Sequence, residues 1–249
     1  MLYHRPMRKS TWHRVVARGL LWMALLLGLP LGALAFYWLL TFPDVARLAK
    51  ANPLSTALME ARKAEAREHG RPLTSRWTWV PLSEISSHLQ KAVIVSEDAG
   101  FFNHEGFDWE GIKEAAEKNL WRGKLARGGS TITQQVAKNL FLSTDKSVLR
   151  KAQEALIARA LEHHLTKRRI LEIYINVAEW GRGIYGAEAA AWHHFQKPSS
   201  DLTEEEAALL AAMLPSPLRY DPLRMTPYLT KRQREILVRM AKTQVKVVN

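Results

Sequence analysis

Two adjacent acids, Glu97 and Asp98, end an apolar stretch that is typical of a buried helix face. Apolar residues at positions 85, 89 and 93 recur every four positions, and Glu97 is the next member of that series. A carboxylate on an apolar face loses hydration, so its pKa rises, and a general base working near neutral pH needs such a pKa. Glu97 is therefore a candidate base, while Asp98 lies on another face. The alternative is an exposed acid pair at a fraying helix end.

A second polar stretch, "GGSTITQQVAKN", covers residues 128–139. Its glycines precede a helix start in which Thr131 and Gln134 have the spacing of a capping box. Free N–H groups at such a start can bind an anion, and Lys138 lies two turns further along. Hydroxyl and amide residues suit a hydroxyl-rich ligand such as a sugar, and this stretch contains Ser130, Thr131, Thr133, Gln134 and Gln135. The alternative is an ordinary turn and helix cap.

The third candidate constellation is Arg150, Lys151 and Glu154, which share one helix face by their spacing. Two cations beside one acid can hold a phosphate while the acid orients them. A surface salt bridge is the alternative interpretation.

Several other chemistries have no support in the sequence. The chain contains no cysteine, which excludes disulfides, thiolate metal sites and cysteine nucleophiles. Ser143 and Lys146 have the Ser-x-x-Lys spacing, but the partner motifs of penicillin-binding enzymes do not follow. The histidine pairs at 163–164 and 193–194 lack further ligands at zinc spacing, so no metal site is predicted.

These residues need a mainly α framework, because helical periodicity dominates and no long alternating strand is present. A short extended segment is expected in "SRWTWVP", residues 75–81. The capping residues expected are Ser83, Thr131 with Gln134, Ser147, Thr166, and Thr203 with Glu206. The expected helices cover 83–98, 109–121, a segment starting at 130 or 131, 147–165, 166–178, 187–195, 203–214 and 230–244.

The N-terminus predicts a membrane anchor. Residues 19–43 carry no charge, and about 20 apolar residues cross a bilayer. Residues 1–18 contain basic but no acidic side chains, which favours a cytoplasmic N-terminus with the rest of the chain outside. A cleaved signal peptide ending near "ALA" (33–35) is the alternative, but the apolar run continues beyond it and favours an uncleaved anchor. Residues 44–76 are expected to form a solvated juxtamembrane connector, and 77–249 the functional domain.

The formal net charge of +12 favours an anionic partner, such as nucleic acid, phospholipid headgroups or a phosphorylated substrate. Five of these positive charges lie in the leader, which leaves +7 from Leu20 onward. The expected domain is therefore itself basic.

Taken in order, these stretches resemble the motifs of the peptidoglycan glycosyltransferase family. "EDAGFFNHEGFD" resembles its Glu-Asp-x-x-Phe-x-x-His-x-Gly motif, "GGSTITQQVAKN" its second motif and "RKAQEALIARALE" its third. "KRRILEIYINVAEWGRGIYGAEAAAWHHFQK" is similar to the fourth and fifth, so the likeness covers residues 80–197. The single anchor and short C-terminus resemble the monofunctional members. Two positions depart from the family: His194 replaces a usual tyrosine, and Gln196 a glycine or small polar residue.

The resemblance implies a lysozyme-like fold with a small membrane-dipping lobe at 109–127, in which Trp109 and Trp121 would sit at the interface. Packing of that segment onto the main domain is the alternative. It also implies a bacterial inner-membrane enzyme with a periplasmic domain. This enzyme would extend glycan strands by inverting transfer from undecaprenyl diphosphate to the GlcNAc 4-hydroxyl of lipid II, which forms β-1,4 links.

In this interpretation Glu97 is the base, and Glu154 orients the cations or contacts the donor. Asp98 is expected to support the turn that carries Phe101 and His104. The expected substrate-binding residues are Asp98, Phe101, His104, Gly129, Ser130, Thr131, Gln134, Gln135, Lys138, Asn139, Lys146, Arg150 and Lys151. No cofactor is required, although Mg²⁺ is plausible at the diphosphate. The expected partners are lipid II, the glycan strand, the bilayer and other cell-wall or division proteins, with no nucleic acid.

Two alternative functions remain open in the sequence. A lysozyme-like glycan-cleaving enzyme also uses one glutamate, but it has no evident need for a cation cluster. A non-catalytic, membrane-tethered basic scaffold would turn over neither lipid II nor glycan.

Overall fold

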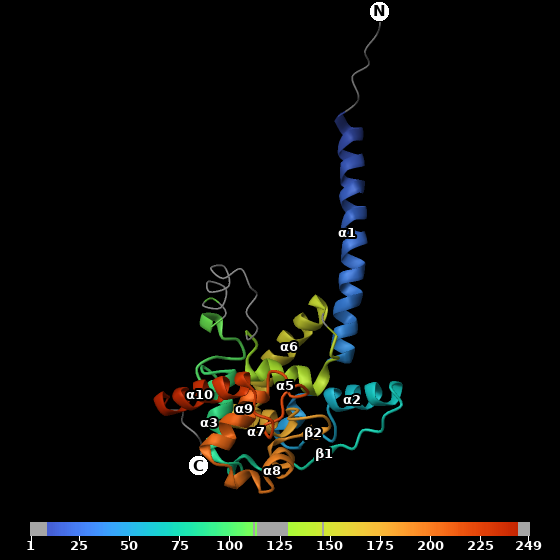
Figure 1. Ribbon diagram of the computed structural model, residues 1–249. Coiled ribbons are helices and arrows are strands. Elements are labelled where there is room, and N and C mark those ends of the chain that lie inside the picture. Colours follow the sequence, from blue (N-terminus) through green and yellow to red (C-terminus); the bar gives the residue numbers. More distant parts are fainter. Residues whose placement is uncertain (1–8, 112, 114–128, 146, 244–249) are drawn as a thin grey trace, which may run out of the picture. The chain divides into compact units, whose positions relative to one another are not determined.

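The computed structural model describes residues 9–111, 113, 129–145 and 147–243. The chain divides into two compact units, Met1–Pro43 and Asp44–Asn249 (Figure 1). In the first unit, α1 (Lys9–Thr41) is one helix with Pro30 inside it. Its segment Trp12–Pro30 is long and apolar enough to cross a membrane, and none of it is buried. This agrees with the predicted anchor, whereas its direction across the membrane and its retention remain predictions.

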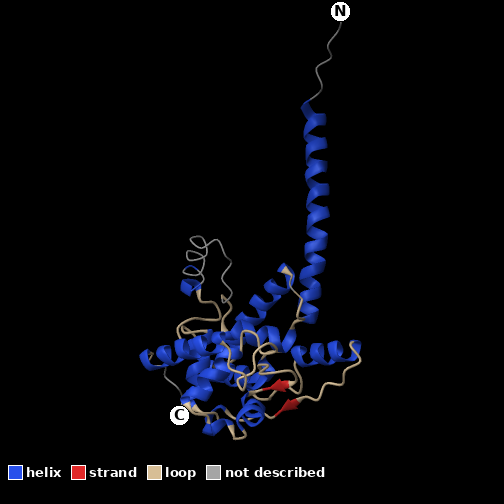
Figure 2. Ribbon diagram, in the orientation of Figure 1, coloured by secondary structure: helices blue, strands red, loops and turns tan. Residues whose placement is uncertain are grey.

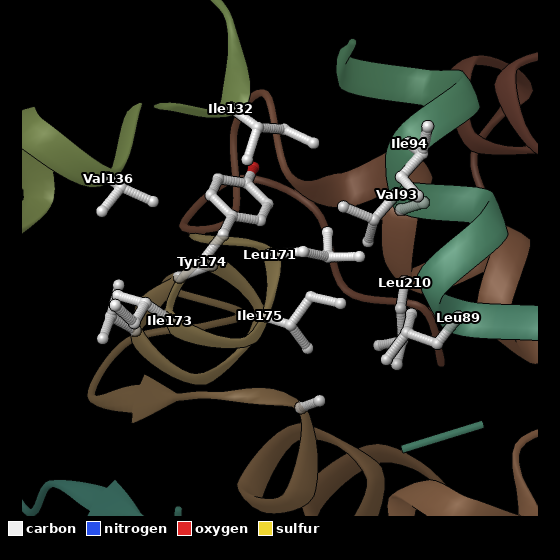
Figure 3. Packing of buried hydrophobic residues seen from close by; sticks show 14 of the residues in the cluster. Leu89, Val93, Ile94, Ile132, Val136, Leu171, Ile173, Tyr174, Ile175 and Leu210 are labelled. Carbon is white, nitrogen blue, oxygen red and sulfur yellow. The ribbon is translucent and has the colours of Figure 1, made fainter. Parts of the chain in front are cut away.

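The second unit is mainly helical, as the sequence predicts (Figure 2). Helix α9 packs against both α3 and α10, and α5 packs against both α6 and α7. The core between these helices contains Leu89 and Val93 of α3, Leu171 and Ile175 of α7, and Leu210 of α9 (Figure 3). The main helices are α3 (Ser87–Glu97), α5 (Ile132–Phe141), α6 (Val148–His164), α7 (Lys167–Val177), α8 (Ala187–Phe195), α9 (Glu204–Met213) and α10 (Pro227–Lys242).

Most of the predicted helix starts are confirmed. The capping boxes Thr131–Gln134 and Thr203–Glu206 are both present, and Ser147 and Thr166 accept backbone N–H groups as N-caps. These starts were predictable because the cap is a contact within one helical turn.

Two helix starts differ from the prediction. Ser83 lies in a short 3-10 turn, η2 (Leu82–Glu84), and Ile85 after it is extended. The N-cap of α3 is Ser86, whose hydroxyl accepts the N–H of His88. Helix α10 starts earlier than position 230, because Thr226 is its N-cap and Pro227 occupies the first turn, where a missing N–H costs nothing.

A two-stranded parallel sheet confirms the extended segment after residue 75. Strand β1 (Arg76–Trp77) pairs with β2 (Ile184–Tyr185). Asn176 at the end of α7 holds the chain beyond β1, because its side chain bonds both the N–H and the carbonyl of Val80.

Residues 44–68 are packed against the domain, which differs from the solvated connector that the sequence predicts. They form η1 (Ala46–Ala49) and α2 (Ala57–Glu68), and the whole segment belongs to the second compact unit. The apolar contribution is small, with Met59 and Ala66 as the buried residues of α2. Hydrogen bonds also hold this segment on the domain: the Arg62 guanidinium donates to the buried Glu179 carboxylate at 3.0–3.2 Å.

Both residues that depart from the family motifs are accommodated by their local surroundings. Gln196 ends α8 with a φ of 61°, in the left-handed region that favours glycine. His194 is buried, and its Nε2 lies 3.0 Å from the carbonyl oxygen of Trp180. Most of the predicted membrane-dipping lobe at 109–127, including Trp121 and most of the predicted helix 109–121, lies outside the described residues. Trp109 itself is exposed and stacks on Phe107.

Replacing Arg62 by alanine is expected to destabilise the domain by about 3 kcal/mol, or roughly 6–12 °C in Tm, because the buried Glu179 carboxylate loses its counter-charge. Thermal unfolding of the detergent-solubilised chain measures this. Arg67→Ala is the control, since Arg67 is exposed on the same helix. Equal losses in both variants would show that the pair adds nothing beyond an exposed arginine.

Candidate active site

Glu97 is the last residue of α3 and is partly buried. Its Oε2 accepts a hydrogen bond of 2.9 Å from Gln135 Nε2, and its Oε1 accepts one of 3.4 Å from Ser96 Oγ. Burial raises the pKa of Glu97 above its ordinary value, although the Gln135 bond and the charge of Arg232 oppose the rise. This is the environment that the apolar stripe predicts, and it suits a carboxylate that must accept a proton.

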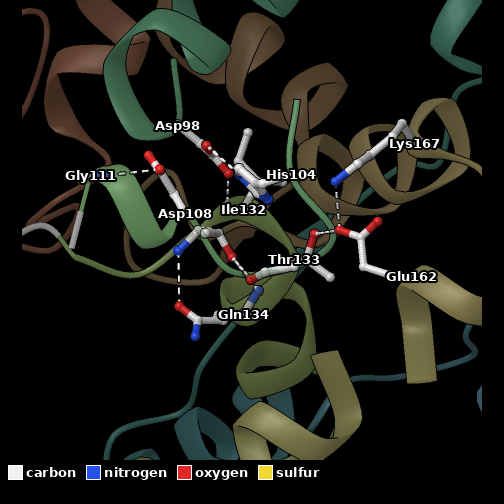
Figure 4. A network of polar contacts seen from close by, with 11 residues as sticks. Asp98, His104, Asp108, Gly111, Ile132, Thr133, Gln134, Glu162 and Lys167 are labelled. Carbon is white, nitrogen blue, oxygen red and sulfur yellow. Dashed lines mark hydrogen bonds and ion pairs between the residues drawn. The ribbon is translucent and has the colours of Figure 1, made fainter. Parts of the chain in front are cut away.

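Asp98 has a different, structural environment. Its Oδ1 lies 2.9 Å from His104 Nε2, and its Oδ2 accepts the backbone N–H of Ile132 at 3.0 Å (Figure 4). The Asp98 side chain is almost wholly buried. It therefore ties the loop after α3 to the first turn of α5, where a negative charge is favoured. The expectation that Asp98 supports the turn carrying His104 is confirmed.

The start of α5 is a satisfied cap. Thr131 Oγ1 accepts the N–H of Gln134, Gln134 Oε1 accepts the N–H of Thr131, and Asp98 takes the N–H of Ile132. Thr131 Oγ1 also donates to the carbonyl of Gly106. These three N–H groups have protein acceptors, as in an ordinary cap, whereas anion binding at the preceding glycine stays a prediction.

Glu154 is a buried carboxylate on α6 that holds two cations, the partly buried Arg150 and the exposed Lys151. The Glu154 side chain is 3% exposed and accepts from Arg150 Nη1 at 2.7 Å and from Lys151 Nζ. Lys151 Nζ also donates to Ser130 Oγ at 2.9 Å, which joins α6 to the segment before α5. A surface salt bridge is therefore the wrong description, since the acid is enclosed and holds both cations in place.

Lys138 links this cluster to Glu97. It lies one turn beyond Gln135 on α5, so both side chains project from one face of that helix. Partial desolvation lowers the pKa of Lys138, although its side chain reaches solvent. The Glu154 charge opposes this shift, and Arg150 adds to it. The ammonium thus belongs electrostatically to the cation cluster.

A cavity of about 210 Å³ opens beside Glu97. Its lining brings Glu97 together with Gly129 and Ser130, two of the predicted ligand-binding residues. A larger cavity, of about 940 Å³, is lined by His104, Trp109 and other residues, and shares Asp108 and Gly111 with the first. Glu97 therefore faces a space in which a substrate can be placed.

The structure separates the predicted site residues into two groups. Glu97, Gly129 and Ser130 line the smaller cavity, and Gln135, Arg150, Lys151 and Glu154 join it through the hydrogen bonds above, with Lys138 linked by its charge. The others are scaffold-like in their surroundings: Phe101 is fully buried with the Lys167 ammonium 4.6 Å from its ring centroid, and Asn139 is buried on α5. Lys146 lies outside the described residues. Substrate contact by any of these residues stays a prediction.

Three residues near Glu97 were not predicted from the sequence. Arg232 and Arg239 of α10 donate to the carbonyls of Ser96 and Val95, at 3.2 and 3.3 Å. Tyr174 of α7 donates to Gln135. The sequence shows only that α10 is basic and that α7 has an apolar face. Arg232 lies 136 positions from Ser96, and no local pattern connects them.

Among the described residues, no group of three or more histidine, aspartate and glutamate side chains is placed to hold a metal ion. The charged groups of the site are instead one partly dry carboxylate and a set of cations. Together with the helical fold, this site combines a partly desolvated carboxylate, Glu97, with cations that Glu154 holds in place.

Comparisons with known proteins give the family. The transglycosylase family model matches residues 65–241. The biosynthetic peptidoglycan transglycosylase of Nitrosospira multiformis is 53% identical over 194 residues, covering 78% of this chain and 84% of that protein. Proteins of the same description from Methylobacillus flagellatus and Herminiimonas arsenicoxydans are 46% and 42% identical, covering 92% and 93% of this chain and 99% of each relative. The chain belongs to the transglycosylase family.

Its activity is therefore that of a peptidoglycan glycosyltransferase, which polymerises glycan strands. The expected glycosyltransferase resemblance is confirmed. The glycan-cleaving and scaffold alternatives are not supported.

The two neighbouring acids are expected to differ in their effect on stability. Asp98→Asn should lower the free energy of unfolding by about 2 kcal/mol, since an amide cannot accept from both His104 and Ile132 as the carboxylate does. Glu97→Gln should be as stable as the wild type or more so at neutral pH. The raised pKa of Glu97 means that its ionised form is disfavoured in the folded state, and glutamine carries no charge. Urea unfolding measures both variants, and an equal loss in the two would contradict this division.

Proposed function

We propose that Glu97 is the general base of an inverting glycosyl transfer. The growing glycan chain on undecaprenyl diphosphate is the donor, and lipid II is the acceptor. Glu97 removes the proton from the GlcNAc 4-hydroxyl, whose oxygen attacks the anomeric carbon from the face opposite the diphosphate. The α-linked donor becomes a β-1,4 link, as in an inverting glycosidase with a sugar hydroxyl in place of water. The single observation that carries this proposal is the partly dry Glu97 carboxylate beside a cavity and a cation cluster.

The leaving diphosphate needs positive charge, because it departs as an anion and requires no proton. Arg150, Lys151 and Lys138 supply that charge, and the buried Glu154 keeps the first two oriented before the donor arrives. Glu154 therefore acts mainly through the cations. Mg²⁺ at the diphosphate would add to this charge but is not required for it.

The proposed setting is the outer face of the bacterial inner membrane, with the N-terminus in the cytoplasm. The basic residues among positions 1–18 and the apolar segment Trp12–Pro30 support this orientation. A lipid-linked substrate also requires the domain to work at the bilayer surface. Contacts with other cell-wall or division proteins remain an expectation from the resemblance.

Glu97→Gln is expected to abolish detectable polymerisation of lipid II, since a positioned base contributes about 10²–10⁴-fold. Gel separation of glycan strands made from labelled lipid II measures this. In the wild type, the rate should fall with decreasing pH at a midpoint above the ordinary glutamate range, because the base must be ionised and its pKa is raised. Strand formation by the folded variant would show that another group is the base.

Arg150→Ala is expected to lower the rate by about 10²-fold, with a smaller effect on Tm, because the donor diphosphate loses a preorganised cation. The rate is measured at varied lipid II, with Mg²⁺ and with a chelator. Arg168→Ala is the control, since Arg168 is an exposed arginine on the neighbouring helix α7. Unchanged kinetics for Arg150→Ala would contradict the donor role.

A further inference from the structure

A line of hydrogen bonds runs from the core of the domain to Glu97. The Tyr174 hydroxyl donates to Gln135 Oε1 at 3.1 Å, and Gln135 Nε2 donates to Glu97 Oε2 at 2.9 Å. The three residues belong to α7, α5 and α3. Tyr174 lies within the apolar cluster with its hydroxyl oxygen turned toward Ile132 of α5 (Figure 3). The base is therefore connected to a side chain that cannot move without disturbing the core.

The chemistry of these groups allows one arrangement when Glu97 is ionised. A carboxylate only accepts hydrogen bonds, so Gln135 must turn its NH₂ group toward Glu97. This leaves Gln135 Oε1 for the Tyr174 hydroxyl. Without that hydroxyl, the amide oxygen loses its donor, and rotation of the amide would bring oxygen against the carboxylate.

We propose that Tyr174 is a positioning residue for the transfer reaction. Through Gln135 it holds an N–H group against Oε2 of Glu97, which fixes the direction of the carboxylate. This inference rests on the proposed role of Glu97 as base. It adds to that role a residue that touches neither substrate nor base.

The same arrangement assigns different tasks to the two oxygens of Glu97. Oε2 has the shorter bond, from Gln135. In the described part of the chain, Oε1 has only the 3.4 Å contact with Ser96 Oγ, and that hydroxyl is itself 3.4 Å from Arg232 Nη2. Oε1 is thus the oxygen that takes the acceptor's proton, while Oε2 stays bound to the amide.

Tyr174 keeps its proton throughout the working range of the enzyme. Burial raises its pKa well above the ordinary value, and the charges of Glu97 and Asp98 raise it further. Tyr174→Phe therefore changes no charge near the base. Among the described residues, the charged and titratable groups near Glu97 are Asp98, Asp108, Lys138, Tyr174, Tyr228, Arg232 and Arg239.

The test is Tyr174→Phe in the full-length chain, with lipid II as substrate. We expect kcat to fall about tenfold while KM changes little. The hydrogen bond from Gln135 lowers the pKa of Glu97, so weakening that bond should raise the pKa. The acid limb of the pH profile should therefore move to higher pH. Tyr185→Phe is the matched control. Tyr185 is also fully buried, and its hydroxyl has no hydrogen-bond partner in the described part of the chain, so wild-type kinetics are expected.

A double-mutant cycle separates positioning from general packing. If Tyr174 acts through Gln135, then Tyr174→Phe should cause no further loss of kcat in a Gln135→Ala background. Additive losses, or a fall in kcat without a shift of the acid limb, would overturn the inference. So would wild-type kinetics of Tyr174→Phe.

Glu97→Gln, measured beside these variants, separates the positioning role of Tyr174 from the proposed role of Glu97 as base. If Glu97→Gln is inactive and Tyr174→Phe resembles the wild type, only the positioning role is wrong. If Glu97→Gln still polymerises lipid II, the proposed base itself is wrong. Melting temperatures of all variants show whether a loss of rate reflects a loss of fold.

Discussion

The site depends on the buried carboxylate of Asp98. By bonding both His104 and the first N–H of α5, it fastens the end of α3 to the start of the helix that carries Gln135 and Lys138. Glu97 is its covalent neighbour, so the same tie sets where the candidate base lies relative to α5. Without this contact, the hydrogen bond from Gln135 to Glu97 would have to hold the end of α3 against α5 without the support of Asp98.

Adjacent positions in the chain thus have opposite roles because their surroundings differ. Asp98 is enclosed, and each of its oxygens has a hydrogen-bond partner within the protein. Glu97 is desolvated with one short hydrogen bond, and burial outweighs the groups that would lower its pKa. The two conditions complement each other. A carboxylate whose hydrogen bonds are complete holds the elements of the site together. A desolvated carboxylate with fewer hydrogen bonds is ready to accept a proton, at some cost in stability.

The cation cluster shows the same principle of prior arrangement. Glu154 is buried and already holds Arg150 and Lys151, so these side chains do not have to be ordered when an anionic donor binds. Helix α5 connects the two parts of the site. On one face of this helix, Gln135 donates a hydrogen bond to Glu97, and Lys138 interacts electrostatically with Glu154 and Arg150. In the proposed reaction, acceptor activation and leaving-group stabilisation would therefore occur side by side.

The sequence by itself determined the features that depend on neighbours within a turn or two. These include the caps at Thr131, Ser147 and Thr166, the shared face of Arg150 and Glu154, and the apolar stripe that ends at Glu97. The order of the motifs also sufficed for the family. Only the tertiary structure decided that residues 44–68 pack on the domain, that Asp98 reaches α5, and that Tyr174 and Arg232 approach the base. Periodicity tells which face of a helix is buried, but the partner of that face depends on how distant helices pack against one another.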